Sequence, residues 1–275
     1  LQNSIKIKND LEEYQAVGIS YAQMGNVYYE IGDFSHAIET YKESLGNFRA
    51  SNMRYNEGRV LSLIAEMYLE IGYFKDMLFY LKEADEIISD FEIPFTSGKL
   101  CLLNARYFYE MKNYENSIDY YKQSIDYFQM AEQRHFNYAA TIELSIVYIA
   151  LENRDKVYSA LKKAEKIGKK LSGYENDVFL TILFEFINGD KVDENDEKLS
   201  QLYKILENND IKNSYKSWWY LGSIYQSMKN DNKSQDCFQK AQLHLEETAQ
   251  KIENSEHRKS FLNTITINQS IRSAV

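Results

Sequence analysis

The chain has 275 residues and a formal net charge of −9, and it is 44% apolar and 27% charged, a composition that supports a large folded core. It contains one proline and 11 glycines, which argues against a sandwich or barrel built on many turns. The acidic balance disfavours nucleic acid as the main partner, because phosphate binding needs concentrated Lys and Arg.

Two further features of the composition narrow the class of protein. No apolar run approaches the roughly 20 residues of a membrane span, so we expect no membrane partner. Cys101 and Cys237 lie far apart, which is neither a disulfide framework nor a zinc spacing and is typical of a reducing compartment. We therefore expect a cytoplasmic protein without cofactor or metal.

The first residues already carry a pattern that returns 40 positions later. The stretch LQNSIKIK at residues 1–8 corresponds to YKESLGNF at residues 41–48, with apolar and small residues at the same places. We interpret residues 1–10 as the end of a second helix from a preceding repeat, in a parent protein with upstream repeats or another domain. The alternative is a natural helix that happens to fit this register.

The same step of 40 runs through the next part of the chain. From Gly25 it reaches three further small residues, namely Ala65, Ala105 and Ser145. An aromatic residue follows each of the four after three places. Nine places after them stand Phe34, Phe74, Tyr114 and, against the pattern, Arg154. A fixed period of this length indicates stacked supersecondary units.

The spacing inside each unit predicts a pair of helices. Apolar residues recur at intervals of three and four. Gly32 and Gly72 stand where the first helix should end, because glycine adopts the left-handed cap at little cost. The small reference residue lets the second helix approach closely, and small residues at 44, 84, 124 and 164 should admit the next unit. Each unit is therefore predicted to be two antiparallel helices with a shared buried face.

A fifth unit should lie between Ser145 and Gly222, where just under two periods remain. We assign FLTILFEFING to its first helix and EKLSQLYKILEN to its second. The polar stretch DKVDENDEK between them has many carboxylates, but a calcium loop of the EF-hand type also needs a glycine in its middle and alternating oxygen ligands. Val192 and the missing glycine break that template, so a solvated loop is favoured.

The clearest single unit is WWYLGSIYQSMKNDNKSQDCFQKA, which starts at residue 218. It resembles the tetratricopeptide repeat, whose signature residues stand here as Trp218, Leu221, Gly222, Tyr225, Phe238 and Ala241. The resemblance covers about four-fifths of the chain. It implies an all-α fold, a right-handed superhelical α-solenoid of antiparallel helix pairs. Because the period is 40 rather than the family's usual 34, the helices should be about one turn longer.

The domain organisation follows from these elements. Residues 11–254 should form the array, with about five to six helix pairs, and residues 255–275 a C-terminal capping helix or tail over the last unit's apolar face. The spacing Ser255-x-x-Arg258-x-x-Phe261-Leu262 is similar to the tail that follows the repeats in large bacterial signalling proteins. Those proteins join a kinase, cyclase or P-loop ATPase module to a repeat array.

No motif of catalysis stands out. GxxxxGK[ST], GxGxxG and GxSxG are absent from the sequence, so nothing indicates a nucleotide or hydrolase site. The four histidines are scattered, and we interpret them as surface or packing residues, as we do the two cysteines. Lysines at 156, 162, 163, 166, 169 and 170 crowd one helix. They form either a solvated face or a docking face for an acidic partner.

The predicted binding groove follows from the resemblance, since first helices line the concave side of such a stack. The positions expected to face it mix cationic, amide, aromatic and apolar side chains, which suits an extended peptide. They are Asn26, Tyr29, Arg59, Ser62, Glu66, Lys99, Leu102, Arg106, Tyr109, Ile142, Ile146, Lys216, Trp219 and Ser223. The Lys and Asn clamp of the family's chaperone-tail binders is not formed, which argues against that ligand.

Three classes of function remain in order of support. The first is a non-catalytic scaffold that binds a protein or peptide, as the sensing or assembly segment of a larger cytosolic signalling protein. The second is a receptor for a short signalling peptide, as in the quorum-sensing regulators built on long-helix repeats of this type. An enzyme is the least supported class, because no pair of acidic residues is singled out by spacing. The sequence leaves homo-oligomerisation open.

Overall fold

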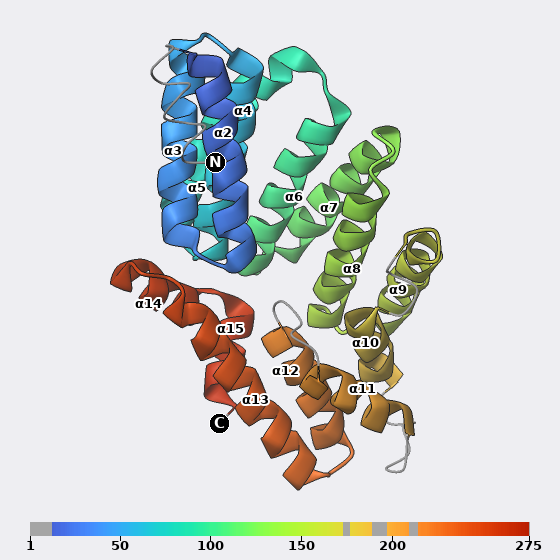
Figure 1. Cartoon of the computed structure of the whole chain (residues 1–275). Coiled ribbons are helices and arrows are strands. Elements are labelled where there is room, and N and C mark those ends of the chain that lie inside the picture. Colours follow the sequence, from blue (N-terminus) through green and yellow to red (C-terminus); the bar gives the residue numbers. More distant parts are fainter. Residues whose placement is uncertain (1–12, 173–176, 189–196, 209–213, 275) are drawn as a thin grey trace. The chain divides into compact units, whose positions relative to one another are not determined.

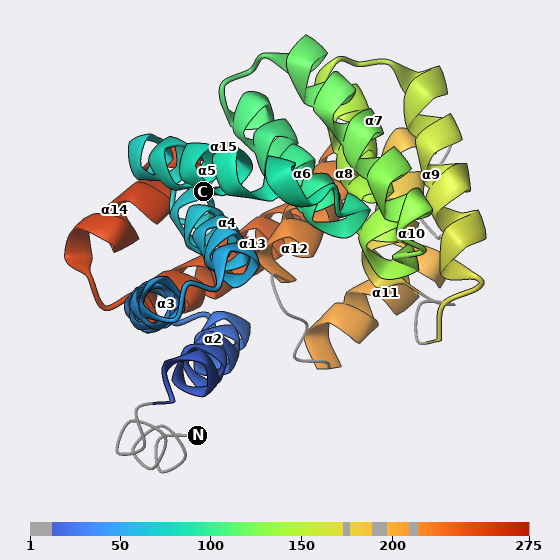
Figure 2. The ribbon, with the colours of Figure 1, turned by 90° about the horizontal axis from the view of Figure 1, so that it is seen from above.

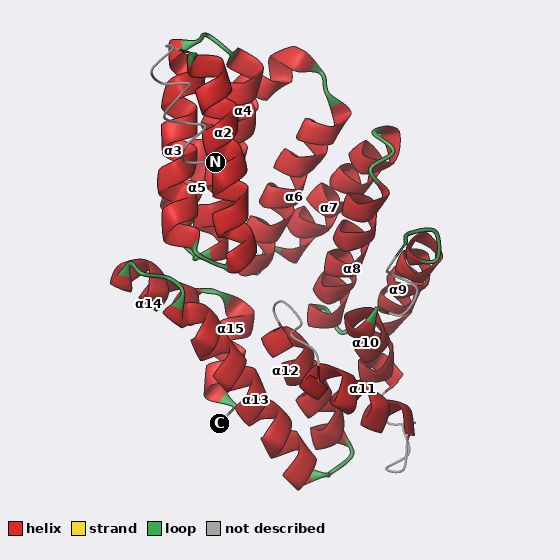
Figure 3. Cartoon of the chain, in the orientation of Figure 1, coloured by secondary structure: helices red, strands yellow, loops and turns green. Residues whose placement is uncertain are grey.

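The computed structural model describes residues 13–172, 177–188, 197–208 and 214–274. Within these ranges the regular structure is helical and no strand is present (Figure 3), which confirms the all-α prediction. None of the helices in this part of the chain is both long and apolar enough to cross a membrane. The helices fall into two compact units, residues 1–131 with 249–265 and residues 132–248 with 266–275.

Unit 1 is a series of antiparallel helix pairs, followed by one helix from the C-terminal part of the chain (Figure 1). Each of its first five α-helices packs against the next α-helix in the chain. The helices are α2 (Tyr14–Ile31), α3 (Phe34–Ala50), α4 (Arg54–Glu70), α5 (Phe74–Ile88), the 3₁₀ turn η1 (Ser89–Phe91), α6 (Pro94–Glu110), α7 (Tyr114–Met130) and α14 (Ser255–Thr264).

Unit 2 continues the same arrangement of paired helices. Figure 2 shows α8 and α9 running side by side along their length. Its helices are α8 (Arg134–Ala150), α9 (Arg154–Gly168), α10 (Val178–Asn188), α11 (Glu197–Asn208), α12 (Ser214–Ser227), α13 (Asp231–Gln250, in this unit up to Thr248) and α15 (Thr266–Ser273).

The lengths of helices and turns account for the 40-residue period. Helices α3, α4, α6, α7 and α8 each have 17 residues, and turns of three residues join most neighbours. The predicted left-handed positions are confirmed at Gly32 and Gly72, with φ of 82° and 77°. Lys112 and Glu152 occupy the equivalent places with φ of 56° and 54°, so the turn itself does not require glycine.

The second helix of most pairs begins with a side-chain cap. Asp33, Asn113 and Asn153 each accept a hydrogen bond from the backbone N–H three residues later, which satisfies one of the unpaired amides of a helix start. Tyr73 stands at the same place before α5 and provides no such cap.

The packing inside a pair explains the small reference residues. A Cβ atom on Gly25 would lie 2.5 Å from the ring of Tyr41, so only glycine lets α3 approach this closely. The Ser44 hydroxyl donates to the carbonyl of Gly18 at 2.7 Å, and Ser124 donates in the same way to Gly98 at 2.8 Å. These serines thus join the two helices of their own pair, whereas the sequence assigned them to the approach of the next unit.

The fifth pair is present where the sequence placed it. α10 and α11 coincide with the two predicted segments to within one residue. Arg154, which breaks the aromatic pattern, donates from Nε and Nη2 to the carbonyl of Ile187 at 2.8 and 2.5 Å and so ties α9 to the end of α10. Residues 190–196 of the polar loop and residues 1–10 lie outside the described residues.

The C-terminal helices divide between the units. α14 packs against the turns of the first two helix pairs in unit 1, where the ring of Phe261 lies 6.4 Å from that of Phe34. α15 belongs to unit 2, and its Ile271 is buried there.

Candidate functional site

Three of the predicted groove residues meet on the first helices of unit 1. Glu66 of α4 accepts from Lys99 of α6 at 3.1 Å and from Arg106 of α6 at 3.3 Å. Arg106 also lies 3.8 Å from Glu70, one turn further along α4. We call Glu66, Glu70, Lys99 and Arg106 the charge cluster. Lys99 and Arg106 are seven positions apart, so two helical turns place them on one face of α6.

Glu66 is held in its ionised form although it is nearly inaccessible to solvent. Burial opposes ionisation of Glu66, but the charges of Lys99 and Arg106 and their hydrogen bonds outweigh it and hold its pKa below the ordinary value. The side chain of Glu66 is 9% exposed, against 17% for Lys99 and 23% for Arg106. The two cations are therefore partly exposed, whereas the carboxylate that they share is nearly inaccessible.

Tyr29 of α2 borders the charge cluster. Its pKa is raised well above the ordinary value by burial first, then by the negative charges of Glu70 and Glu66, which Arg106 partly offsets. The hydroxyl thus stays protonated at every physiological pH. The face formed by α2, α4 and α6 consequently presents a phenol, two cations and two carboxylates.

The other predicted residues of unit 1 have separate surroundings. Asn26 is exposed, and its side-chain oxygen accepts from the hydroxyl of Tyr41 at 2.7 Å. The guanidinium of Arg59, on an exposed residue, lies 5.8 Å from the ring centre of Tyr55. Ser62 and Leu102 are buried, while Tyr109 is half-buried beside Tyr114.

The predicted residues of unit 2 lie on α8 and α12. Ile142 is buried and Ile146 is half-buried. Ser223 donates to the carbonyl of Trp219 at 2.9 Å, and the ammonium of Lys216 lies 5.8 Å from the ring centre of Tyr215. Lys216, Trp219 and Ser223 stand three and four positions apart, so they share one face of α12.

Glu70 was missed by the sequence analysis. It stands four positions after Glu66 and so on the same face of α4, a spacing that could have identified it. The described residues contain no group of three or more His, Cys, Asp or Glu side chains that could hold a metal ion. Burial raises the pKa of the Cys101 thiol to about 11 and that of Cys237 to about 12, which keeps both thiols protonated.

Two further sets of charged residues in unit 2 form ion pairs with residues nearby. On α9, Lys162 and Lys169 both bind Glu165, at 3.0 and 3.2 Å. The predicted lysine-rich face is exposed. On α13, the ammonium of Lys240 binds Glu207 at 2.9 Å and lies 4.9 Å from the ring centre of the buried Trp218. The contacts of Lys240 join α13 to α11 and α12 within the unit.

Comparison with known families identifies the repeat. The tetratricopeptide-repeat family matches residues 19–48 and 215–242, the second of which includes the unit that begins at Trp218. No curated protein matches the sequence.

Several solved structures share the fold. Aspartyl phosphate phosphatase F from Bacillus subtilis is 17% identical with a TM-score of 0.64, and the match covers 87% of this chain and 65% of that protein. A Rap protein complexed with competence and sporulation factor is 16% identical with a TM-score of 0.62, over 98% of this chain and 81% of that one. Apo RapI is 12% identical with a TM-score of 0.59, over 94% and 98%. At these identities the likeness concerns the fold.

Proposed function

Because the chain carries tetratricopeptide repeats, we propose that it is a non-catalytic scaffold that binds a protein or peptide on the first helices of unit 1. It would serve as the sensing or assembly segment of a larger cytosolic signalling protein. The phosphatase of similar fold is longer, since this chain spans 65% of it.

The observation that carries this proposal is the sharing of Glu66 by Lys99 and Arg106. Both cations are held in place by a buried carboxylate and remain partly exposed. A ligand carboxylate can approach Arg106 where Glu70 makes only a loose contact of 3.8 Å. Such a preorganised guanidinium binds a carboxylate in a defined geometry, and the ring of Tyr29 beside it adds an aromatic surface.

The test is capture of partner proteins from a lysate of the source cells, with Arg106→Gln as the disabling variant. We expect Arg106→Gln to lose the partner and Arg106→Lys to keep part of the binding. Lys82→Gln is the matched control, because Lys82 lies on the second helix α5 with its side chain 80% exposed. Circular dichroism verifies that each variant keeps its helicity.

Two results would contradict the proposal. One is equal capture by Arg106→Gln and the wild type, which would remove the charge cluster from the binding surface. The other is equal loss in Arg106→Gln and Lys82→Gln, which would indicate a general charge effect.

A second candidate function is that of a receptor for a short signalling peptide. It is favoured by the fold shared with a Rap protein complexed with competence and sporulation factor, a match that covers 98% of this chain. A thermal-shift screen with short hydrophobic peptides separates the two candidates, since a ligand at a hundred times its Kd stabilises by about 2.7 kcal/mol. A shift with one peptide that Arg106→Gln abolishes would favour the receptor, and no shift with any peptide would count against it.

A further inference from the structure

Helix α14 rests on the turns of unit 1 through aromatic and polar contacts. Phe261 is buried against Phe34 of the first pair, with ring centres 6.4 Å apart. His257 lies edge-on to Tyr73 at the start of the second pair, with ring centres 4.8 Å apart. The Tyr73 hydroxyl donates to a carboxylate oxygen of Glu256 at 3.4 Å. These residues are far apart in the sequence, so the contact is tertiary.

The turn that precedes α5 lies close to α14. At Gly72 an added Cβ would stand 2.8 Å from Cβ of Thr264 in α14. Lys112 and Glu152 hold the equivalent left-handed conformation without glycine. The close approach of α14, in addition to the turn, therefore explains why this position has no side chain.

Tyr73, the next residue, departs from the capping pattern of the other repeats. Asp33, Asn113 and Asn153 cap their helices at this position, and such a cap contributes about 1 kcal/mol. Tyr73 forgoes that stabilisation and contacts His257 and Glu256 of α14 instead. In this turn Gly72 leaves room for α14, and Tyr73 contacts it.

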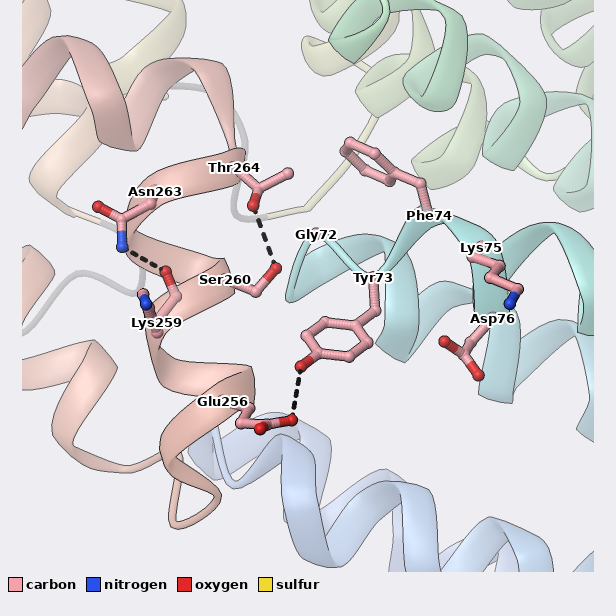
Figure 4. Close-up of a pocket in the computed structure, with 10 residues that line it drawn as sticks. All are labelled: Gly72, Tyr73, Phe74, Lys75, Asp76, Glu256, Lys259, Ser260, Asn263 and Thr264. Carbon is pink, nitrogen blue, oxygen red and sulfur yellow. Dashed lines mark hydrogen bonds between the residues drawn. The ribbon is translucent and has the colours of Figure 1, made fainter.

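An open cleft of about 500 Å³ lies between the α4–α5 turn and α14, lined by residues that include Lys75, Asp76, Lys259 and Asn263 (Figure 4). α14 has ten residues, and helices of that length are marginal in water without tertiary contacts. Detachment of α14 would therefore be accompanied by its unfolding, at a cost well below that of the whole unit.

The environment of His257 opposes a positive charge. Its Nδ1 atom is buried and has no hydrogen-bond partner among the described residues. Burial lowers the pKa of His257, and the Lys42 ammonium of α3 acts in the same direction, while Asp76 of α5 and Glu256 of α14 oppose them. The rings of Tyr68 in α4 and Tyr73 complete its surroundings.

We propose that α14 is a detachable helix, and that protonation of His257 releases it from the α4–α5 turn of unit 1. In the docked state His257 is neutral. In the detached state it titrates near its ordinary value of about 6.5. Docking is therefore fully favoured above that pH and weakens as the pH falls through it, because the detached state binds the proton first.

The experiment is hydrogen exchange of the full chain between pH 7.5 and 5, corrected for intrinsic rates. We expect peptides that cover residues 255–264 to lose about tenfold in protection for each pH unit below the His257 titration, while α6 and α7 keep theirs. His257→Phe preserves a ring without the charge and should stay protected throughout. His257→Arg should be unprotected at every pH. His244→Phe, on the half-exposed His244 of α13, is the matched control and should follow the wild type.

A second variant tests the docking without the titration. Tyr73→Asn restores the cap of the other repeats and removes the ring that meets His257, so α5 should gain protection while α14 loses it at all pH values. The proposal is overturned if the wild type and His257→Phe lose protection at the same pH. It is also overturned if α14 is equally protected in Tyr73→Asn and the wild type, or if its protection does not depend on pH.

Discussion

The Nζ atom of Lys99 lies 3.1 Å from Oε2 of Glu66, and this ion pair joins the first helices of two successive pairs, α4 and α6. The carboxylate is nearly inaccessible, and a second cation, Arg106, lies on its other oxygen. The cluster therefore has two roles: it holds two repeats together, and it fixes two cations on the surface proposed for binding.

Removal of the Glu66 charge should destabilise unit 1. In Glu66→Gln two partly buried cations would lie close together without their carboxylate, and loss of one partner from such a pair costs about 3 kcal/mol. Urea unfolding followed by circular dichroism measures the loss. Glu86→Gln is the control, since Glu86 is an exposed residue that lies 3.8 Å from Lys82 on α5 and should change stability by less than about 0.5 kcal/mol. Equal effects of the two variants would contradict the assignment.

The same carboxylate should give the stability a pH dependence. Because the pKa of Glu66 is lowered in the folded chain, its contribution is fully present above the unfolded value of about 4.3. It is lost as the pH falls through the lower folded value. The difference in unfolding free energy between wild type and Glu66→Gln should thus be constant from pH 7 to 6 and shrink below about pH 4. If the difference between wild type and Glu66→Gln persisted unchanged to pH 3, the predicted pH dependence would be wrong.

Two glycines in the first helix pair should respond in opposite directions to alanine. Gly25→Ala places a methyl group 2.5 Å from the ring of Tyr41, and such overpacking costs about 1–3 kcal/mol. Gly46 lies in α3 with no atom within 4 Å of an added Cβ, so Gly46→Ala should stabilise by about 0.5–1 kcal/mol through helix propensity. Thermal unfolding of both variants checks the prediction, which fails if the two changes have the same sign.

The cysteines should report on the two units separately. Cys101 lies in unit 1 and Cys237 in unit 2, and both thiols have raised pKa values, about 11 and about 12. Labelling by a thiol reagent at pH 8 should be about a hundredfold or more slower than in the unfolded chain, because the thiolate is the reactive form. Single Cys→Ser variants assign the two rates. Rapid labelling of Cys237 in the native protein would contradict its burial.

The repeat and most helix bounds could be predicted from the sequence, because they depend on local spacing. Gly25 and Gly32 identify a close helix contact and a helix end, and both have these roles in the structure. The segments assigned to α10 and α11 are correct although that pair departs most from the pattern. Three residues of the predicted groove, Glu66, Lys99 and Arg106, contact one another in the structure, while their role in binding stays a prediction.

The docking of α14 could not be predicted, because its signals are departures from the repeat. Neither Tyr73 at a cap position nor the spacing that contains Phe261 indicates a contact between α14 and the first two helix pairs. Only the tertiary structure brings them to adjacent turns. The contact of Arg154 could not be predicted either. Its partner is the backbone carbonyl of Ile187, and a backbone group is not marked by any side-chain pattern.

The placement of Tyr73 has a consequence for engineering. A designer who averaged the repeats of this chain would write Asn at that position, as in the third and fourth pairs, and would obtain a better-capped, more uniform array. That idealised protein would be more stable and would have lost the contact of Tyr73 with His257 and Glu256 of α14.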